Sequence, residues 1–427
     1  MRCIFTGGTV FADGTLEKAD FAVDGGQLAP VPPGGPEDWL RDGWSVENVS
    51  RLLAVPGFVD LHVHLRQPGY EYKETIASGT AAAAAGGYTT VCAMPNLNPV
   101  PDSREHLGAQ LEIIRRDAVI HVLPYGAITV GERGEELSDM AAMAPDIAGF
   151  SDDGRGVQSM DVMRRAMLLA KSLHRPIAAH CEDESLLPRG WAAHDGAFAR
   201  RRGLTGNPPE SEWRQVERDL NLVRETGCPY HVCHVSTKES VELVRQAKRE
   251  GLPVSCETGP HYLTLCDEDL QDDGRFKMNP PIRAVSDRDA LLAGLLDGTV
   301  DCIATDHAPH SEKEKSGGLR RSLNGIVGLE TAFPVLYTRL AEPGRVPLGT
   351  LLRALCVRPR EILGLPGGNF RAGDPADITL LDLHCPYIID SAAFRSLGHA
   401  SPFDGWAVCA ALAATICGGK CVYRRCA

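Results

Sequence analysis

The sequence has no cysteine pair at CxxC spacing and no apolar segment long enough to cross a membrane. Fourteen cysteines are present, and most stand singly in apolar runs, as Cys92, Cys233 and Cys302 do. Isolated thiols of this kind are typical of a reducing cytosol rather than of a disulfide framework. The first residues, MRCIFTGGTVFADG, lack the apolar core of a signal peptide. We therefore expect a cytoplasmic protein without a membrane partner.

Positive charge is also scarce. The 44 Lys and Arg residues are outnumbered by 56 Asp and Glu residues, which gives a formal net charge of -12. An acidic chain is poorly suited to gripping nucleic acid or anionic membranes, although a local basic pocket for a small anion is compatible with it. The length of 427 residues allows one large domain and a small one.

Both ends of the chain have the pattern of short strands and turns. IFTGGTVFADG and FAVDGGQL near the start are typical of hairpins with Gly and Asp at the turns, and PVPPGGPED is a loop. ADITLLDL and GGKCVYRR near the end predict further strands. The sequence thus predicts one small β-sandwich domain formed by residues 1–55 and 368–427.

Residues 56–367 follow a different pattern, in which short apolar runs alternate with helical stretches. One such stretch, STKESVELVRQAKREG, has Ser236 and Glu239 at capping-box spacing, which predicts Ser236 as the helix cap. Eight strand–helix repeats predict an α/β fold with a (β/α)8 TIM-like barrel. A doubly wound open sheet is the alternative, but it usually has a Gly-rich loop after its first strand, which is missing here. The eight runs are GFVDLHVH, YTTVCAMP, VIHVLPYGAI, IAGFSDD, PIAAHC, PYHVCHVS, LPVSCETG and VDCIATD.

Histidines and aspartates occur where these predicted strands end. His62 and His64 are two residues apart and therefore face the same side of their strand, near its carboxyl end, where barrel active sites form. Taken alone, a histidine in a strand is more often structural, and an aspartate after a strand more often caps a helix. The other strand-end residues are Asn96, Asp152 with Asp153, His180, His234 and Asp306.

Together these side chains predict a metal centre, because structural roles for all of them would bury much unsatisfied polarity. Imidazoles with carboxylates and no thiolate favour catalytic zinc. Six ligands are too many for one tetrahedral zinc but suffice for two, if one carboxylate bridges them. Such a pair generates a hydroxide nucleophile for hydrolysis, or its reverse, at a carbonyl carbon. Asp306 is predicted to bind one metal and to take the proton of the water.

Three nearby histidines have other predicted roles. Strand parity from His234 places His231 on the opposite face, so we interpret it as structural. His310 lies in a loop beyond the strand end, within reach of a substrate, and the role of His307 stays open. The segment from residue 310 to 324 is rich in Ser, Lys, Glu and Gly, which indicates mobility and suggests a lid.

Several longer motifs resemble the dihydroorotase family of the amidohydrolase superfamily. They run from Pro56 to Trp406 in the order that the family has. The motifs are DLHVHLRQPGYEYKETIASGTAAAAAGGYTTVCAMPNLNP, FSDDGRGV, AAHCEDE, YHVCHVSTKES, MNPPIR, ATDHAPHSEKEK, GIVGLETAFP and SPFDGW.

The resemblance implies two zinc ions per subunit and a particular ligand set. Where many superfamily members have a carboxylated lysine, this chain has GFSDDG. It is similar to the type in which an aspartate bridges the metals, and the spacing to His180 favours Asp153 over Asp152. One zinc would be held by His62, His64, Asp153 and Asp306, and the other by Asp153, His180 and His234.

The implied reaction is the reversible cyclisation of N-carbamoyl-L-aspartate to L-dihydroorotate in pyrimidine biosynthesis. Arg66 would bind the substrate carboxylate bidentately. The chain departs from the family in one respect: RRSLNG stands where family members usually have an Ala-Pro pair. This departure concerns only the contacts at Asn324 and Gly325. The implied substrate contacts are His64, Arg66, Asn96, Asn279, His310, Asn324 and Gly325.

Two other functions stay open at this point. One is a hydantoinase-like or allantoinase-like cyclic amidohydrolase, against which the missing lysine and the presence of Arg66 and Asn96 argue. The other is a non-catalytic scaffold for aspartate transcarbamoylase, against which the complete ligand set argues. A homo-oligomer is compatible with the sequence, and so is an active enzyme that associates with aspartate transcarbamoylase. The sequence does not determine whether either forms.

Overall fold

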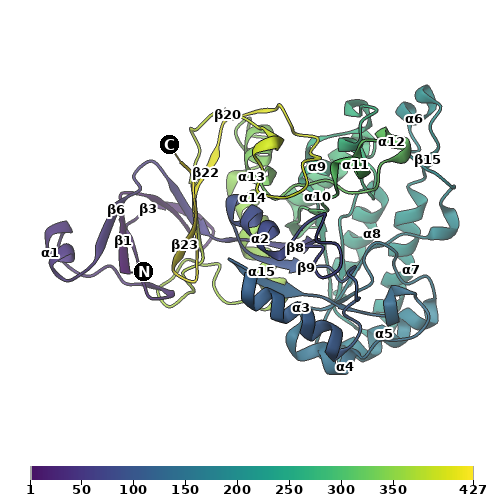
Figure 1. Ribbon diagram of the computed structural model, residues 1–427, viewed down its shortest axis with the longest axis horizontal. Coiled ribbons are helices and arrows are strands. Elements are labelled where there is room, and N and C mark those ends of the chain that lie inside the picture. The colour runs from purple at the N-terminus through teal and green to yellow at the C-terminus, as the bar shows by residue number, and fades with distance from the viewer. Residues whose placement is uncertain (1, 427) are drawn as a thin grey trace.

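A computed structural model describes residues 2–426 (Figure 1). Each of the eight apolar runs contains a strand, and neighbouring strands pair in parallel in chain order. The strands are β8 (Phe58–Val63), β9 (Tyr88–Ala93), β10 (His121–Pro124) with β11 (Gly126–Ala127), β12 (Phe150–Ser151), β13 (Ile177–Ala179), β16 (Tyr230–Val232), β17 (Val254–Thr258) and β18 (Cys302–Ile303).

The last of these strands returns to the first. Val63 of β8 forms a parallel bridge with His307, and the His64 amide donates to the His307 carbonyl at 2.8 Å. Below this bridge, the buried carboxylate of Asp60 accepts hydrogen bonds from the Thr305 amide at 3.1 Å and from the Thr305 hydroxyl at 2.6 Å. The eight parallel strands therefore close into a ring, and the predicted α/β class is confirmed.

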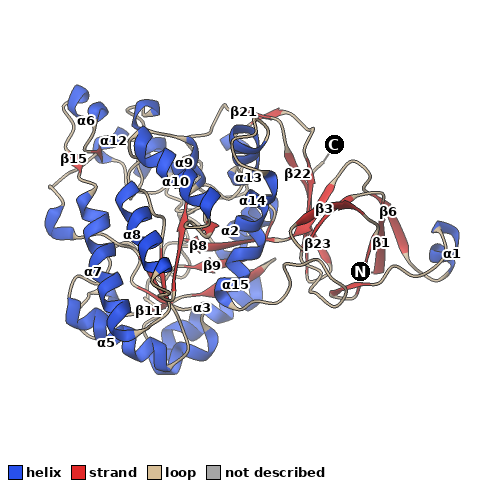
Figure 2. Cartoon of the chain, turned by 180° about the vertical axis from the view of Figure 1, so that it is seen from behind, coloured by secondary structure: helices blue, strands red, loops and turns tan. Residues whose placement is uncertain are grey.

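Helices connect the strands and cover the outside of the ring (Figure 2). The segments 332–341 and 348–363 are each continuous helical runs with a wider turn inside them. The helices are α1 (Pro36–Arg41), α2 (Ile76–Ala85), α3 (Arg104–Asp117), α4 (Met140–Met143), α5 (Met160–Ser172), α6 (Ala197–Arg202), α7 (Glu210–Thr226), α8 (Lys238–Arg249), α9 (Pro260–Thr264), α10 (Val285–Asp297), α11 (Glu312–Lys315), α12 (Gly318–Arg321), α13 (Ala332–Leu336), α14 (Leu348–Leu352) and α15 (Arg358–Leu363).

The cap of α8 differs from the prediction. Thr237, not Ser236, precedes the helix, and its hydroxyl accepts from the Ser240 amide. The buried carboxylate of Glu212 on α7 accepts from the amides of Ser236 and Thr237 at 3.1 and 3.0 Å, and the Ser236 hydroxyl donates to it as well. Ser236 is thus used to fasten the preceding loop to α7, which moves the helix start by one residue.

The two ends of the chain form two sheets on one side of the ring (Figure 1). The order of strands is β5-β4-β1-β6 in one sheet and β23-β22-β19-β7-β2-β3 in the other. Phe5, Val23, Ile378 and Ile416 belong to one apolar core between them, so both ends are needed to build it. The strands are β1 (Arg2–Thr6), β2 (Thr9–Ala12), β3 (Thr15–Lys18), β4 (Phe21–Asp24), β5 (Gln27–Ala29), β6 (Ser45–Asn48), β7 (Leu53–Pro56), β19 (Ile378–Asp382), β22 (Ala411–Cys417) and β23 (Lys420–Arg424).

Residues 384–409 leave these sheets and run over loops of the ring. They contain the short strands β20 (Tyr387–Ile388) and β21 (Ala407–Val408). Phe403 shares an apolar cluster with Met278, which lies in the loop after η5 (Gly274–Phe276). The Ser396 hydroxyl donates to the buried carboxylate of Glu74. This excursion holds the loops at the carboxyl ends of the strands in place. The loop after β13 carries two further short strands, β14 (Ala193–His194) and β15 (Gly206–Asn207).

The segment from residue 310 to 324, predicted to be mobile, contains α11 and α12 and has a buried anchor. Lys315 is buried, and its ammonium donates to the carbonyls of Lys277, Leu323 and Gly325 at 2.9, 2.7 and 2.6 Å. Burial lowers the pKa of Lys315 to about 7. If residues 310–324 opened as a lid, the bonds from Lys315 to Lys277 and Gly325, which lie outside the segment, would have to break.

The fourteen cysteines, which all fall within the described part of the chain, are free thiols. Among residues 2–426, no helix combines the length and the apolarity that a membrane crossing requires.

Candidate metal centre

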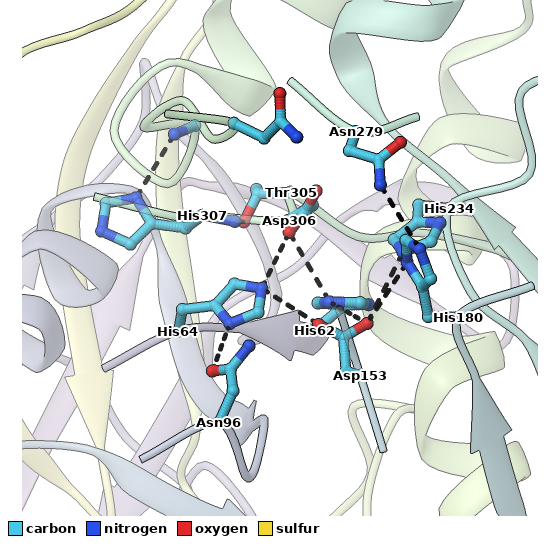
Figure 3. Close-up of polar contacts among 12 residues, drawn as sticks. His62, His64, Asn96, Asp153, His180, His234, Asn279, Thr305, Asp306 and His307 are labelled. Carbon is cyan, nitrogen blue, oxygen red and sulfur yellow. Dashed lines mark hydrogen bonds and ion pairs between the residues drawn. The ribbon is translucent and has the colours of Figure 1, made fainter. Parts of the chain in front are cut away.

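The six predicted ligands meet at the carboxyl ends of the strands, as Figure 3 shows. His62 lies in β8 and His64 directly follows it; the others lie one to three residues beyond β12, β13, β16 and β18. We call these six residues the mouth cluster. All are buried, with exposed fractions of 7% or less. The mouth cluster consists of His62, His64, Asp153, His180, His234 and Asp306.

Two groups of three ligand atoms form within the mouth cluster, and Asp153 belongs to both. In the first group, Asp153 oxygens lie 3.4 Å from His62 Nε2 and 3.5 Å from His64 Nε2. Asp306 joins this group, with its Oδ1 3.0 Å from His64 Nε2 and 3.5 Å from His62 Nε2. In the second group, Asp153 Oδ1 lies 3.8 Å from His180 Nδ1 and 3.6 Å from His234 Nε2.

All of these distances except the 3.0 Å between His64 and Asp306 fit metal ligands better than hydrogen bonds. Ligand atoms on a tetrahedral zinc with bonds of about 2.0–2.1 Å lie roughly 3.3–3.4 Å apart. His62 Nε2 and Asp153 Oδ1 are 3.4 Å apart and fully buried, yet neither makes a hydrogen bond of acceptable geometry to any described residue. Buried polar atoms that face each other without bonding need a partner between them. The residues present therefore fit a pair of divalent cations.

The pKa shifts of the mouth cluster also favour bound cations. Burial raises the pKa of Asp153, but the charge of His62 and the neighbouring imidazole of His234 outweigh it, so that the pKa lies well below its ordinary value. Burial lowers the pKa of His62, but Asp153 raises it well above the ordinary value. The hydrogen bond from His64 likewise overcomes burial and holds the pKa of Asp306 low. The cluster thus keeps its carboxylates ionised and favours positive charge beside them.

Outside the ligands, a buried carboxylate orients His62. Glu257 lies in β17, is fully buried, and has its Oε1 3.1 Å from His62 Nδ1. Its Oε2 lies 3.2 Å from His231 Nε2, and His231 Nδ1 lies 2.8 Å from the Ser255 hydroxyl. The imidazoles of His231 and His62 together overcome the effect of burial and lower the pKa of Glu257 to about 2. A carboxylate behind a metal-binding histidine fixes its ring and increases its basicity.

Two more ligand histidines, His64 and His180, have a polar partner behind the imidazole ring. Asn96 Oδ1 lies 2.9 Å from His64 Nδ1. His180 Nε2 lies 3.4 Å from a carboxylate oxygen of Glu182, to which the Asn279 amide donates at 3.0 Å. Asn96 and Asn279, predicted as substrate contacts, therefore also touch ligand residues or their supports.

A cavity of about 200 Å³ opens over the metal-binding groups. Arg66 lines it and is held by a bond from its Nε to the Pro309 carbonyl at 3.3 Å. His310 Nε2 lies 2.7 Å from the carbonyl oxygen of Asn324. Gly325 approaches so closely that a Cβ there would lie 2.5 Å from the Ala308 carbonyl oxygen. The cavity is lined by His64, Arg66, Asn96, Asp153, Gly154, His180, His234, Asn279, Asp306, Ala308, His310, Asn324 and Gly325.

Three residues of this site adopt backbone conformations that side chains disfavour. Arg66, His234 and Asp306 have φ values of 59°, 34° and 47°. Non-glycine residues in this region are uncommon, and each costs of order 1–3 kcal/mol, so they persist where the surrounding structure enforces them. All three residues line the cavity.

Other polar residues of the motifs lie outside the mouth cluster. The carboxylate of Asp152 accepts from the amides of Ile128 and Thr129 at 2.8 and 3.1 Å and ties two strand ends together. His307 Nε2 lies 3.4 Å from Glu74. Glu257, Glu182 and Glu74 did not follow from the sequence reasoning. A glutamate inside an apolar strand was the available signal for Glu257.

Comparison with known proteins identifies relatives along the whole chain. A family model described as "Dihydro-orotase-like" matches residues 51–240. A dihydroorotase of Geobacillus sp. (strain WCH70) is 49% identical over 428 residues, which cover 100% of this chain and 99% of the relative. The chain belongs to the dihydroorotase family. A dihydroorotase of Bacillus caldolyticus is also 49% identical, over 97% of this chain and 96% of its own.

Two solved structures with a similar fold are a hydantoinase and a dihydropyrimidinase. An L-hydantoinase (dihydropyrimidinase) from Arthrobacter aurescens superposes with a TM-score of 0.88 at 25% identity, covering 99% of this chain and 96% of its own. A dihydropyrimidinase from Brevibacillus agri NCHU1002 gives a TM-score of 0.86 at 22% identity, covering 99% and 95%. These likenesses show that the dihydroorotase family member described here shares its fold with hydantoinases.

Proposed function

We propose that this chain is a zinc-dependent dihydroorotase, which interconverts N-carbamoyl-L-aspartate and L-dihydroorotate. One observation carries the proposal: a single cavity is lined by members of both metal-binding groups, by their shared residue Asp153 and by Arg66. The family relationship supports the same activity. Zinc suits the ligand set, because imidazole and carboxylate ligands without thiolate are typical of catalytic zinc.

Two zinc ions would be held by the mouth cluster, with Asp153 between them. When bound, they would polarise the amide carbonyl of the ring and make water a nucleophile at neutral pH. In hydrolysis, Asp306 takes the proton of the attacking water and delivers it to the ring nitrogen as the carbon–nitrogen bond breaks. In cyclisation, Asp306 takes the proton from the attacking nitrogen. Its lowered pKa keeps it ionised, which is the form that can accept a proton.

The substrate carboxylate would be bound by Arg66 at the side of the cavity. A guanidinium can donate two parallel hydrogen bonds to a carboxylate, and Arg66 already points into the cavity. Asn96, Asn279 and His310 line the same cavity and would add donors. Asn324 and Gly325 would contact the ring. His64 would serve both the metal and the substrate.

The ring of strands is proposed as the (β/α)8 barrel of the catalytic domain, with residues 56–367. Residues 1–55 and 368–427 are proposed as the small β-sandwich domain. The shared apolar core of the two terminal segments supports this division.

A hydantoinase-like activity on an uncharged ring is the main alternative, because hydantoinases share the fold. Arg66 argues against it, since an uncharged ring would offer this largely buried guanidinium no carboxylate to pair with. Turnover of dihydroorotate, hydantoin, dihydrouracil and allantoin should be measured in parallel with the zinc-loaded chain. We expect a strong preference for dihydroorotate, and a preference for an uncharged ring would contradict the proposal.

A non-catalytic scaffold role is tested by metal content. All six ligands are in place, so the purified chain should bind about two zinc ions and lose activity to a chelator. A chain without bound zinc and without zinc-restored activity would favour the scaffold. A homo-oligomer, an association with aspartate transcarbamoylase and a cytoplasmic location stay predictions from the sequence. Sedimentation of the chain alone and with that enzyme tests the first two.

A further inference from the structure

A second cluster of metal-ligating side chains lies at the opposite end of the ring, where the strands begin. His121 is the first residue of β10, Asp377 precedes β19 and Cys417 ends β22. One ligand atom from each of the three residues lies within 4.8 Å of the other two. We call these three residues the junction cluster, because they join a strand of the ring to two strands of the six-stranded sheet.

One ligand–ligand distance in the junction cluster has the length expected on a tetrahedral metal. His121 Nε2 lies 3.3 Å from Asp377 Oδ2, close to the roughly 3.3–3.4 Å between two ligands on a tetrahedral zinc. The other oxygen of Asp377 accepts from the Gly418 amide at 2.7 Å, which fixes the carboxylate and leaves Oδ2 facing the histidine. Cys417 is buried and close to the Thr89 carbonyl, with its Sγ 3.6 Å from that oxygen.

The chemistry of the three ligands also fits one class of metal. A nitrogen, an oxygen and a sulfur ligand together suit zinc and similar borderline transition metals better than calcium or magnesium. Ionised Asp377 and Cys417 would balance the two positive charges of the ion. The side chain of His121 is 52% exposed, whereas that of Asp377 is 11% exposed, so an ion can enter from the His121 side and keep water as its fourth ligand.

We propose that His121, Asp377 and Cys417 form a third metal site, which binds a divalent ion of the zinc class and fastens the small β sheets to the ring. The site is structural, since it lies at the end of the strands away from the cavity. No ligand of the mouth cluster takes part in it.

A proton is the competing occupant. Hydrogen bonds to Asp377 and Cys417 raise the pKa of His121 to about 10, so a protonated His121 can pair with Asp377 without any metal. The charge of Arg360 also acts on Asp377, although its guanidinium is bonded to the carbonyls of Gly57 and Cys356, both at 2.6 Å. The experiment must therefore distinguish a metal from an ion pair.

Cobalt(II) makes this distinction, because a thiolate ligand gives it a near-ultraviolet charge-transfer band. The full chain is loaded with Co2+ in place of zinc, and the band and the number of ions per chain are measured. Cys417→Ser removes the thiolate of the site. Cys421→Ser is the matched control, because Cys421 lies on the same hairpin and is exposed. His121→Gln is a second test, at a half-exposed position.

The expected result is a thiolate band in the wild type and in Cys421→Ser, and loss of the band with one ion fewer in Cys417→Ser. His121→Gln should also bind one ion fewer and should gain less thermal stability from added Co2+ than the wild type. Hydrolysis of dihydroorotate should be unchanged in all three variants.

Three results would overturn the proposal. They are a wild type without the band, a band that persists in Cys417→Ser, and a band that disappears in Cys421→Ser. The band does not depend on turnover, so it tests this site even if the chain does not hydrolyse dihydroorotate.

Discussion

The mouth cluster and the junction cluster contain similar residues but differ in what surrounds them. In the mouth cluster every ligand is buried, and His62, His64 and His180 each contact an outer partner, namely Glu257, Asn96 and Glu182. In the junction cluster the histidine is half exposed and the ligands come from two separately built parts of the fold. Preorganised ligands beside a cavity suit catalysis, whereas ligands that span two parts suit fastening.

The largest difference between the clusters should appear when Asp306 is changed. Asp306→Asn keeps the shape of the side chain but cannot accept the proton, so turnover of dihydroorotate should fall by about 10²–10⁴-fold. Steady-state kinetics checks this, with thermal unfolding to show that the variant is folded. Asp289→Asn, on the exposed surface of α10, is the control and should be unaffected. Near-normal turnover of Asp306→Asn would contradict the proposed proton transfer.

A change at Arg66 should affect recognition of the substrate carboxylate without affecting metal binding by the mouth cluster. Arg66→Met removes a charge-assisted pair that contributes roughly 1.5–3 kcal/mol, so KM for dihydroorotate should rise about 10–100-fold. The number of bound zinc ions should stay the same. Arg165→Met, on the outer face of α5, serves as the control. If KM were unchanged, Arg66 would not bind the substrate carboxylate.

Glu257 tests whether the partners behind the ligand histidines increase the zinc affinity of the mouth cluster. Glu257→Gln leaves the size of the side chain unchanged but removes the negative charge behind His62, so zinc affinity should fall about 10–100-fold. Competition with a chelator measures this affinity. The exposed Glu135→Gln should match the wild type. An unchanged affinity would show that burial alone orients His62.

Glu330, a buried carboxylate outside both clusters, shows how burial affects the pH dependence of stability. Burial raises the pKa of Glu330 to about 7, and its Oε1 accepts from the amides of Arg395 and Ser396 at 2.9 and 3.2 Å. Because the folded pKa exceeds the ordinary value, the stabilising effect is complete below about pH 4.5 and is lost as pH rises through about 7. Glu330→Gln keeps both bonds, since the amide oxygen can accept them.

The variant should therefore match the wild type near pH 4 and be more stable by about 3 kcal/mol near pH 9. Denaturant unfolding at the two pH values measures the difference. Glu342→Gln, an exposed position, should show no such pH dependence. Equal stability of Glu330→Gln and the wild type at high pH would mean that Glu330 ionises freely in the fold.

The sequence predicts those parts of the molecule that depend on local pattern. Each apolar run contains a strand, and the residues at the strand ends meet because parallel strands end on one side. Glu257 was missed because its partner, His62, is 195 residues away, and only the closed ring shows that both face inward. The cap of α8 was wrong because Glu212, on another helix, binds Ser236. The course of residues 384–409 follows from packing on loops that are distant in the chain.

The bond between Asp60 and Thr305 joins residues 245 positions apart, and it closes the ring. Five of the six mouth ligands lie before residue 240, yet the sixth, Asp306, is fixed only when this closure forms. Contacts of such long range form late in folding, because a long loop must close first. A chain still being synthesised therefore exposes imidazoles without a finished centre. Because Asp306 is both a ligand of the first metal-binding group and the proposed proton acceptor, we expect that group and the activity to be completed together when this closure forms.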